Sequence, residues 1–325
     1  MHMIRGIWMY FFDLHCDTIT RLSTGERLEL GDRSLCRNGA HIDLERMEGL
    51  SWCQCFAIFM PDGLRGRAAI DYYEQNLRFF RTQLAANKDR IAQIRTAGEI
   101  LETVDSGKCA ALLTVEGGSV LAGDCSRAAE LAADGVRMLT LTWNGENELG
   151  SGVDMPGGLT PRGVKVVEAC EDAGIIVDVS HLNDRGFGQA ADLARRPFVA
   201  SHSNARAVCN HRRNLTDEQF ARIVAAKGLV GLNFCTHFLS EEIADPPFSC
   251  LAAHIEHFLS LGGEETLALG SDYDGTDVPS WLDPARKVED LYQLVCGAFG
   301  QTLANRLFFE NALDFMKRYE LSGEG

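Results

Sequence analysis

The sequence predicts a (β/α)8 TIM-type barrel that forms a single domain over residues 1–325. Short apolar runs typical of buried strands recur eight times, and amphipathic helical segments separate them, which indicates parallel pairing. Polar and ionisable residues follow several of these runs, and the carboxyl ends of barrel strands meet at one rim. A doubly wound open sheet is the competing fold, and the number of strands alone separates the two.

The first predicted strand is an aromatic and β-branched run, Ile7–Phe12, which leads directly into Asp13-Leu14-His15-Cys16-Asp17. No small-residue cleavage site follows it, so we interpret it as a strand and not as a signal peptide. The seven later runs are Trp52–Phe59, Cys109–Val115, Val136–Thr142, Ile175–Val179, Phe198–Ser201, Leu229–Phe234 and Leu267–Gly270. In the second run, Cys53 and Cys55 are expected to pack one face of the strand.

The helices between these strands have recognisable boundaries. Arg67–Asn87 is long and amphipathic, and Pro161 is placed to open a helix over Arg162–Ala173 as a first-turn proline. Thr216 and Gln219 have the spacing of a capping box before a helix over Phe220–Lys227, and Gly228 is the expected stop.

The composition excludes several classes of protein. A net charge of −15 argues against nucleic acid or an anionic membrane as a partner, because both require a basic face. No apolar stretch reaches the ~20 residues of a membrane span. Eleven cysteines without a Cys-x-x-Cys pair fit the reduced thiols of a cytoplasmic protein better than a disulfide framework.

Ionisable residues follow five of the predicted strands. His15 and Asp17 lie at i and i+2, so strand geometry directs both to one face. The later ones are Glu116, His181, His202 and Asp272. Taken singly, the histidines could be hydrogen-bonded strand ends and the glutamate a helix cap. Together they favour a metal centre at the rim, because a buried carboxylate cluster without a cation is costly to ionise.

Two metal ions suit this set better than one. A single zinc ion takes three protein ligands and a water, which leaves ligands over. The two oxygens of Glu116 could bridge ions ~3.5–4 Å apart, with His15 and Asp17 on one ion and His181 and His202 on the other. Imidazole and carboxylate ligands suit Zn²⁺, although manganese or cobalt could occupy them. A hydroxide between the ions, its pKa lowered toward ~7, would be the nucleophile.

The motifs at these positions resemble the membrane (renal) dipeptidase family, the M19 metallopeptidases of the amidohydrolase superfamily. The matching pieces are Asp13-Leu14-His15-Cys16-Asp17, Val115-Glu116-Gly117-Gly118, Asp178-Val179-Ser180-His181, Ser201-His202-Ser203-Asn204-Ala205, Arg212-Arg213-Asn214 and Gly270-Ser271-Asp272-Tyr273-Asp274-Gly275. The resemblance implies a zinc-bridged barrel with the ligands named above, and a homodimer. It further implies that Asp272 meets the substrate amino group and handles protons, and that Arg213 holds the terminal carboxylate.

Two positions depart from the family pattern. Trp143 stands where the renal enzymes have a histidine thought to polarise the scissile carbonyl, and an indole offers only one N–H donor. Asn144 could donate in its place. Phe238 falls where the family has a tyrosine that contacts the substrate.

The functional hypothesis is a zinc-dependent dipeptidase that cleaves small unblocked dipeptides and tolerates a D-residue at the C-terminal position. Asp272 would take the nucleophile's proton and pass it to the leaving amine. The alternatives are a related amidohydrolase acting on a cyclic amide or lactone, and a non-catalytic metal-binding barrel. His254 and His257 could share a helix face, but no strand-end residue joins them, so a surface or packing role is expected.

Overall fold

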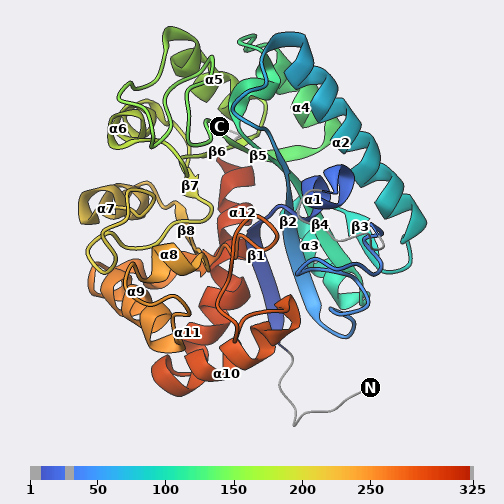
Figure 1. Ribbon diagram of the computed structural model, residues 1–325, viewed down its shortest axis with the longest axis vertical. Helices are drawn as coiled ribbons and strands as arrows, with labels where there is room; N and C mark the ends of the chain where they lie inside the picture. The colour runs from blue at the N-terminus through green and yellow to red at the C-terminus, as the bar shows by residue number, and fades with distance from the viewer. Residues whose placement is uncertain (1–8, 26–32, 323–325) are drawn as a thin grey trace.

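The computed structural model describes residues 9–25 and 33–322, and its strands form one parallel sheet that closes on itself (Figure 1). The closed ring consists of β1 (Tyr10–Cys16), β2 (Ser51–Phe59), β4 (Cys109–Glu116), β5 (Val136–Thr140), β6 (Ile176–Asp178), β7 (Val199–Ala200), β8 (Leu229–Leu232) and β9 (Leu267–Leu269). Pairing of β2 with β4 completes the ring. The predicted (β/α)8 barrel is confirmed, and the open doubly wound sheet is wrong.

One further strand was not predicted. β3 (Ile91–Gln93) pairs with Cys109–Ala111 at the start of β4, whereas β5 pairs with β4 only from Leu113 onward. A strand of three residues is too short to show a period-2 pattern, so the sequence carries no clear signal for it.

β1 extends further than predicted at its carboxyl end. Ile7 and Trp8 lie outside the described residues, and the strand continues past Phe12 to Cys16. The register against β2 shifts, because Asp13 pairs with Gln54 whereas Cys16 pairs with Phe56. An irregularity of this kind re-aims side chains, and here it lies between Asp13 and Cys16, the stretch that contains His15.

The long helices follow their predicted ranges closely. α2 is Gly66–Ala86, α5 is Pro161–Asp172 with its proline in the first turn, and α7 is Asp217–Ala225. The capping box of Thr216 and Gln219 is confirmed. The others are α1 (Thr18–Thr24), α3 (Ala97–Asp105), α4 (Arg127–Asp134), α6 (Asp184–Leu193), α8 (Thr236–Leu239), α9 (Phe248–Ser260), α10 (Val288–Phe299), α11 (Gln301–Asn305) and α12 (Asn311–Leu321). Within the described residues, none is long and apolar enough to cross a membrane.

The end of α7 corrects one expectation. The left-handed residue after the helix is Lys227, with φ of 54°, and not Gly228. Gly228 is needed for a different reason, because a Cβ there would lie 2.2 Å from the carbonyl oxygen of Phe198. The glycine allows the chain entering β8 to pass close to the chain entering β7.

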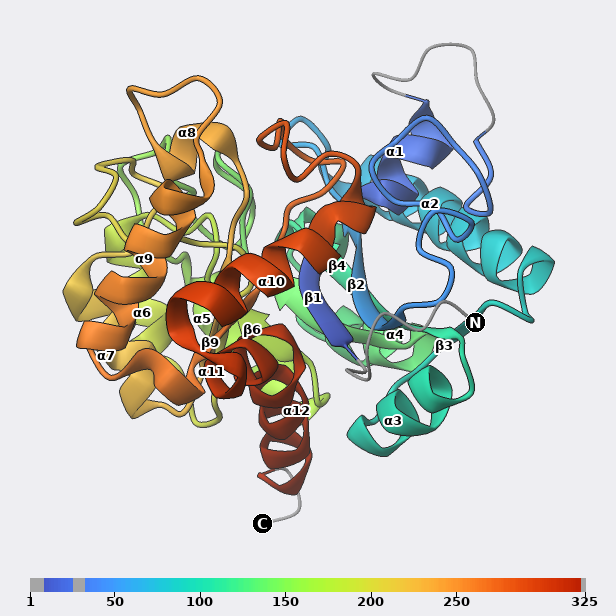
Figure 2. The same ribbon diagram turned by 90° about the horizontal axis from the view of Figure 1, so that it is seen from below.

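Apolar side chains fill the N-terminal half of the barrel. Phe12, Leu14 and Leu112 belong to a buried cluster with Phe315 and Met316 of α12. α12 lies at the end of the barrel opposite to α1 (Figure 2). Cys53 and Cys55 are buried in the same cluster, as predicted, and all eleven cysteines are free thiols. This packing leaves the C-terminal rim as the polar end of the barrel.

Gly228→Ala should destabilise the protein by about 1–3 kcal/mol, the usual cost of forcing an atom into a packed site. Gly188→Ala is the matched control, because a Cβ at that position in α6 meets nothing within 4 Å. The control should be neutral or stabilising by up to about 1 kcal/mol. Urea unfolding of both variants measures the difference, and equal midpoints would contradict the proposed close approach.

Candidate metal centre

The carboxyl ends of the strands surround a cavity of about 310 Å³. Residues at or just after the ends of β1, β2, β4, β5, β6 and β9 line it, together with residues from the segments that follow β7 and β8. Among them are Asp17, Glu116, His181, Arg213 and Asp272. The structure therefore brings residues up to 255 positions apart in sequence into one site at the rim where barrel enzymes carry out their chemistry.

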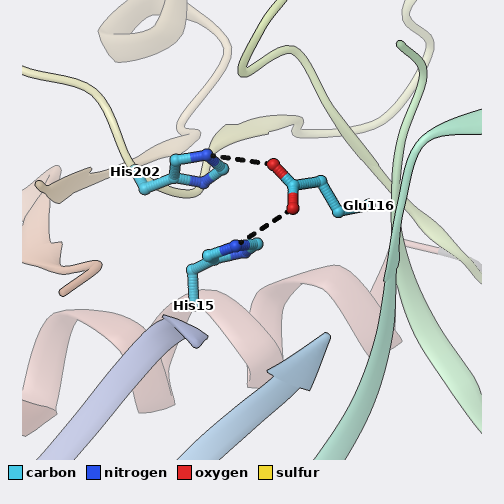
Figure 3. A group of neighbouring side chains, drawn as sticks. All are labelled: His15, Glu116 and His202. Atoms are coloured by element: carbon cyan, nitrogen blue, oxygen red, sulfur yellow. Dashed lines mark ion pairs between the residues drawn. The ribbon is translucent and has the colours of Figure 1, made fainter. Parts of the chain in front are cut away.

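Glu116, the last residue of β4, faces two histidines, His15 of β1 and His202 after β7 (Figure 3). One carboxylate oxygen is 3.5 Å from His15 Nε2, and the other is 3.6 Å from His202 Nε2. The two imidazole rings stack with their centroids 4.0 Å apart. The carboxylate thus directs one oxygen to His15 and the other to His202, as a carboxylate that bridges two metal ions would.

His181 approaches the same carboxylate from the end of β6. Its Nε2 is 2.8 Å from Glu116 Oε1 and 2.9 Å from His202 Nε2. The backbone of His181 is left-handed, with φ of 69°. Such a conformation is uncommon outside glycine and is often found at functional sites.

A second group consists of His15, Asp17 and Asp272, whose ligand atoms all lie within 4.8 Å of one another. His15 Nε2 is 3.4 Å from Asp17 Oδ2 and 4.0 Å from Asp272 Oδ1. Asp17 is the N-cap residue of α1, yet its side chain makes no capping hydrogen bond. A capping role therefore does not explain the Asp17 carboxylate, which faces His15 together with Asp272.

The tautomers of the two later histidines follow from their other ring nitrogens. His181 Nδ1 is 2.7 Å from Asn144 Oδ1, an acceptor, so Nδ1 carries the proton. Ser201 Oγ donates to Asp178 and therefore accepts from His202 Nδ1, at 2.7 Å. Both Nε2 atoms then present lone pairs to each other and to Glu116. Three acceptors at such short range repel one another unless a cation lies among them.

The pKa shifts of the ionisable side chains also indicate that these groups repel one another without a cation. Burial and the charge of Glu116 raise the pKa of Asp17 to about 7. Burial, opposed by His15 and reinforced by Glu116, raises the pKa of Asp272 to about 6. Burial and nearby Arg213 lower the pKa of His181 to about 4. The protein alone does not keep all these carboxylates ionised, so the donor set fits divalent cations.

Arg213 supplies a buried positive charge beside this cluster. It is 6% exposed, and one Nη is 3.4 Å from the backbone oxygen of His202. Its Nε has no hydrogen-bond partner among the described residues. Its guanidinium carbon lies 5.5 Å from the ring centroid of Phe238, which also lines the cavity.

Trp143 and Asn144, the two candidates for the missing family histidine, both line the cavity. The Trp143 ring meets Phe59 edge to face at 5.0 Å and lies 6.3 Å from the His181 ring. Asn144 uses its amide oxygen to hold His181. The Trp143 ring therefore contributes apolar surface to the cavity, and the amide NH2 of Asn144 is the part of that side chain not bonded to His181.

Several other ionisable residues form hydrogen bonds or ion pairs outside the metal centre. Asp274 accepts hydrogen bonds from Thr18 Oγ1 and the His41 backbone, both at 2.6 Å, and so ties the loop after β9 to α1. His254 is fully buried and accepts a hydrogen bond from the backbone of Ala205, at 3.1 Å. His257 pairs with Asp217 at 2.7 Å on the surface. The packing and surface roles expected for the two helix histidines agree with these contacts.

Sequence reasoning gave no role to three residues that touch the site residues. Asn233 Nδ2 donates to Asp272 Oδ2 at 3.0 Å. Asp13 and Asp178 are both 0% exposed and hold the serines beside Asp272 and His202. The sequence shows the Asp-x-His spacing of Asp13 and the Asp-x-x-His spacing of Asp178. It does not distinguish a carboxylate that supports a metal ligand from one that binds the metal.

The chain is similar to proteins of known family. A family model described as membrane dipeptidase (peptidase family M19) matches residues 8–324. A crystallised metallopeptidase from Rhodobacter sphaeroides, liganded with a phosphinate mimic of the dipeptide L-Ala-D-Ala, is 28% identical, with a TM-score of 0.88 over 96% of this chain and 100% of that one. The dipeptidase verJ of Clonostachys rogersoniana is 29% identical over 78% of this chain and 69% of its own. An uncharacterized protein in the pqqA 5′ region of Klebsiella pneumoniae is 32% identical over 76% of this chain and 96% of its own.

The geometry predicts that the purified protein holds about two divalent ions per chain, because a bridging carboxylate lies between two sets of ligands. His181→Ala should lose at least one ion without unfolding, since the apolar strand faces and not the rim form the core. Elemental analysis of both proteins, with circular dichroism as the folding control, tests this expectation. An unchanged metal content in the variant would remove His181 from the ligand set.

Proposed function

The chain belongs to the membrane dipeptidase family, peptidase family M19, and we propose that it is a zinc-dependent dipeptidase that hydrolyses small unblocked dipeptides. The observation that carries this proposal is the pairing of opposite charges in one cavity. Asp272 lies beside the histidine cluster, and Arg213 is a buried cation in the same cavity wall. A dipeptide has one ammonium and one carboxylate, so its two ends match the two side chains.

In this proposal, His15 and Asp17 would hold one Zn²⁺ ion, His181 and His202 would hold the other, and Glu116 would offer a carboxylate oxygen to each. Zinc is favoured because the donors are imidazoles and carboxylates without a thiolate. When bound, the ions supply polarisation of the scissile carbonyl and a water whose pKa is lowered toward ~7. The protein residues supply orientation, charge anchoring and proton transfer.

In the proposed reaction, Asp272 serves both steps of the proton transfer. Its Oδ2 is fixed by Asn233, while its Oδ1 faces His15 and the cavity. The carboxylate accepts a proton from the attacking water and returns it to the leaving amine. Before that step it pairs with the substrate ammonium, which fixes the position of the N-terminal nitrogen of the dipeptide.

Arg213 is the better of two arginines in the cavity for holding the substrate carboxylate. Arg21 also lines the cavity, but it lies 3.4 Å from the carboxylate of Asp274 and shares its charge with it. Arg213 has no carboxylate partner among the described ion pairs, and its planar group suits a carboxylate. A cyclic amide or a lactone lacks both charges, so the two anchors favour the dipeptidase over these alternatives.

The departures from the family pattern affect the side-chain walls more than the charge anchors. Trp143, Phe59 and Phe238 form an apolar lining that would contact substrate side chains. Asn144 orients His181, and its NH2 group could donate to the scissile carbonyl. Because the anchors hold charges and not side chains, a D-residue at the C-terminal position should be accepted. The L-Ala-D-Ala mimic bound by the Rhodobacter sphaeroides relative supports this proposal.

A homodimer and a cytoplasmic location complete the proposal. The first follows from the family resemblance, and the second follows from the cysteine usage of the sequence.

Asp272→Asn should lower kcat by ~10²–10⁴, the usual size of a lost acid–base contribution, while the metal content stays unchanged. Asp277→Asn is the matched control, because Asp277 is an exposed carboxylate on the same loop. Steady-state kinetics with elemental analysis of both variants gives the answer. Turnover of Asp272→Asn close to that of the control would assign the proton transfer to another group.

Unblocked dipeptides should be cleaved at least ~10-fold better than N-acetyl dipeptides or tripeptides, because each lost charged contact is worth ~1.5–3 kcal/mol and a decade requires ~1.4 kcal/mol. The measurement is kcat/KM for an L,L dipeptide, its L,D counterpart, the N-acetyl form and a tripeptide. Equal rates on the acetylated form would remove the ammonium anchor, and the protein would then be a general amidase.

A further inference from the structure

Two aspartates that take no direct part in the proposed reaction are the most fully hydrogen-bonded carboxylates of the barrel rim. Asp178, the last residue of β6, accepts from the backbone N–H of Ser180 at 3.0 Å and of Ser201 at 2.9 Å. It also accepts from the hydroxyls of Ser201 and Thr140, both at 2.6 Å. Four donors from three neighbouring strand ends therefore converge on one carboxylate that is 0% exposed.

Asp13, on β1, repeats this arrangement with different partners. It accepts from the backbone N–H of Ser271 at 2.7 Å and from its hydroxyl at 2.6 Å. The amide of Gln54 donates at 2.8 Å from the other side, and the backbone N–H of His15 lies 3.4 Å away. Each aspartate thus binds a backbone N–H two residues ahead, both donors of one serine, and a side chain from the strand on its other side.

The two carboxylates lie where neighbouring strands of the barrel share the fewest registered residue pairs. β6 and β7 share a single registered pair, Asp178 with Val199, and β1 and β9 share a single pair, Asp13 with Leu269. Beyond its pair, Asp178 joins β6 to the backbone and hydroxyl of Ser201. Asp13 joins β1 to Ser271 in the same way, beside the backbone hydrogen bonds from Asp272 N–H to His15 O and from Asp17 N–H to Tyr273 O.

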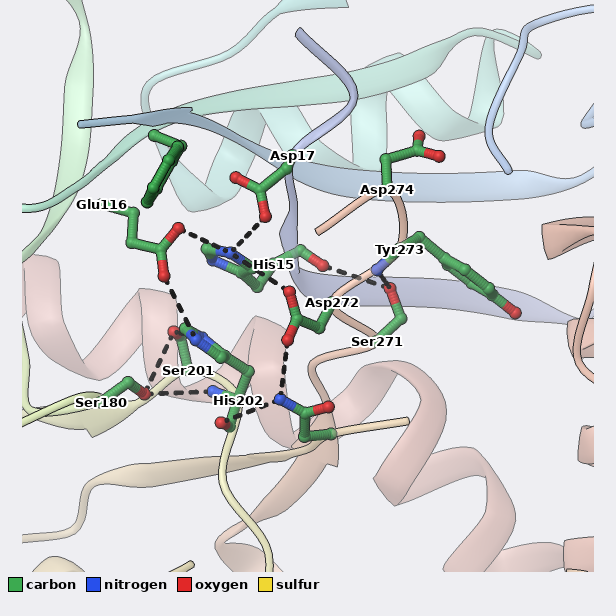
Figure 4. A network of polar contacts seen from close by, with 12 residues as sticks. His15, Asp17, Glu116, Ser180, Ser201, His202, Ser271, Asp272, Tyr273 and Asp274 are labelled. Atoms are coloured by element: carbon green, nitrogen blue, oxygen red, sulfur yellow. Dashed lines mark hydrogen bonds and ion pairs between the residues drawn. The ribbon is translucent and has the colours of Figure 1, made fainter. Parts of the chain in front are cut away.

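Each clamped serine directly precedes a residue of the metal centre. Ser201 Oγ accepts a hydrogen bond from the Nδ1–H of His202, which leaves the lone pair of Nε2 free to bind a cation (Figure 4). Ser271 precedes Asp272, whose backbone is left-handed with φ of 62°. The hydroxyl of Ser271 also accepts from the backbone of Tyr273 at 3.1 Å, so the serine holds both sides of Asp272 (Figure 4).

We propose that Asp13 and Asp178 are positioning residues that act through Ser271 and Ser201, the first to hold Asp272 in place and the second to fix the tautomer and direction of His202. The Asp178 half rests on the metal site alone and not on the identity of the substrate. The Asp13 half rests on the proposed dipeptidase function. Neither aspartate needs to touch a metal ion or a substrate.

Removing the serine hydroxyls tests the proposal with little risk to the fold. In Ser201→Ala, Asp178 keeps Thr140 and two backbone donors, so no buried charge loses all its partners. His202 Nδ1 alone loses its acceptor. Ser203→Ala is the matched control, because Ser203 is a buried serine on the other side of His202 whose hydroxyl has no partner in the described chain.

The readout is the dissociation constant for Zn²⁺, measured by competition with a chromophoric chelator and without substrate. Ser201→Ala should bind Zn²⁺ about 10–100-fold more weakly than the parent, as is usual for a lost partner of a ligand histidine. Its kcat at saturating Zn²⁺ should return to within about threefold of the parent, because the ligand itself is intact. Ser203→Ala should bind Zn²⁺ like the parent. A parental affinity in Ser201→Ala, or an equal loss in both variants, would overturn the assignment.

Ser271→Ala tests the second half at saturating Zn²⁺. Its kcat should fall at least about tenfold while its melting temperature stays near that of the parent, because misplacement of a catalytic group costs rate more than stability. An unchanged kcat would overturn the role of Asp13. If the parent protein itself does not cleave dipeptides, the proposed function fails, whereas the Zn²⁺ affinities of the Ser201 and Ser203 variants still decide the role of Asp178.

Discussion

The structure depends on how the buried carboxylate of Glu116 is neutralised. One of its oxygens faces His15, and the other faces His181 and His202, all within 3.6 Å. Asp17 and Asp272 add two more carboxylates to the same small volume. Like charges at this range in a site shielded from water repel strongly, so the arrangement is stable only with positive charge among them. Divalent cations meet this requirement with the lone pairs that the site already presents.

The barrel keeps the charged rim residues apart from the apolar core that stabilises the fold. Apolar side chains and α12 fill the N-terminal half of the barrel, and the rim can therefore be polar without weakening the core. At the rim, Asp13 and Asp178 are satisfied by four donors each and do not depend on a cation. The site thus combines two kinds of buried carboxylate: some saturated by the protein, and others left for a ligand.

The sequence predicted what depends on local pattern. The strands and the Thr216 capping box follow from residue types a few positions apart, and the barrel places the strand-end residues in one cavity. The contacts that the sequence did not predict join distant segments: Asp13 takes its donors from residues 41 and 258 positions away. The register shift between Asp13 and Cys16 and the contact of Asn144 with His181 depend on strand register and loop path, which residue spacing does not encode.

We propose that this member of the dipeptidase family hydrolyses dipeptides with two metal ions that share Glu116. The most direct test of this proposal is the titration of metal-free protein with Zn²⁺ while the hydrolysis of an unblocked dipeptide is followed. With Glu116 as a bridge, activity should rise to its maximum only as about two equivalents are bound. Full activity at one equivalent, or none at two, would contradict it.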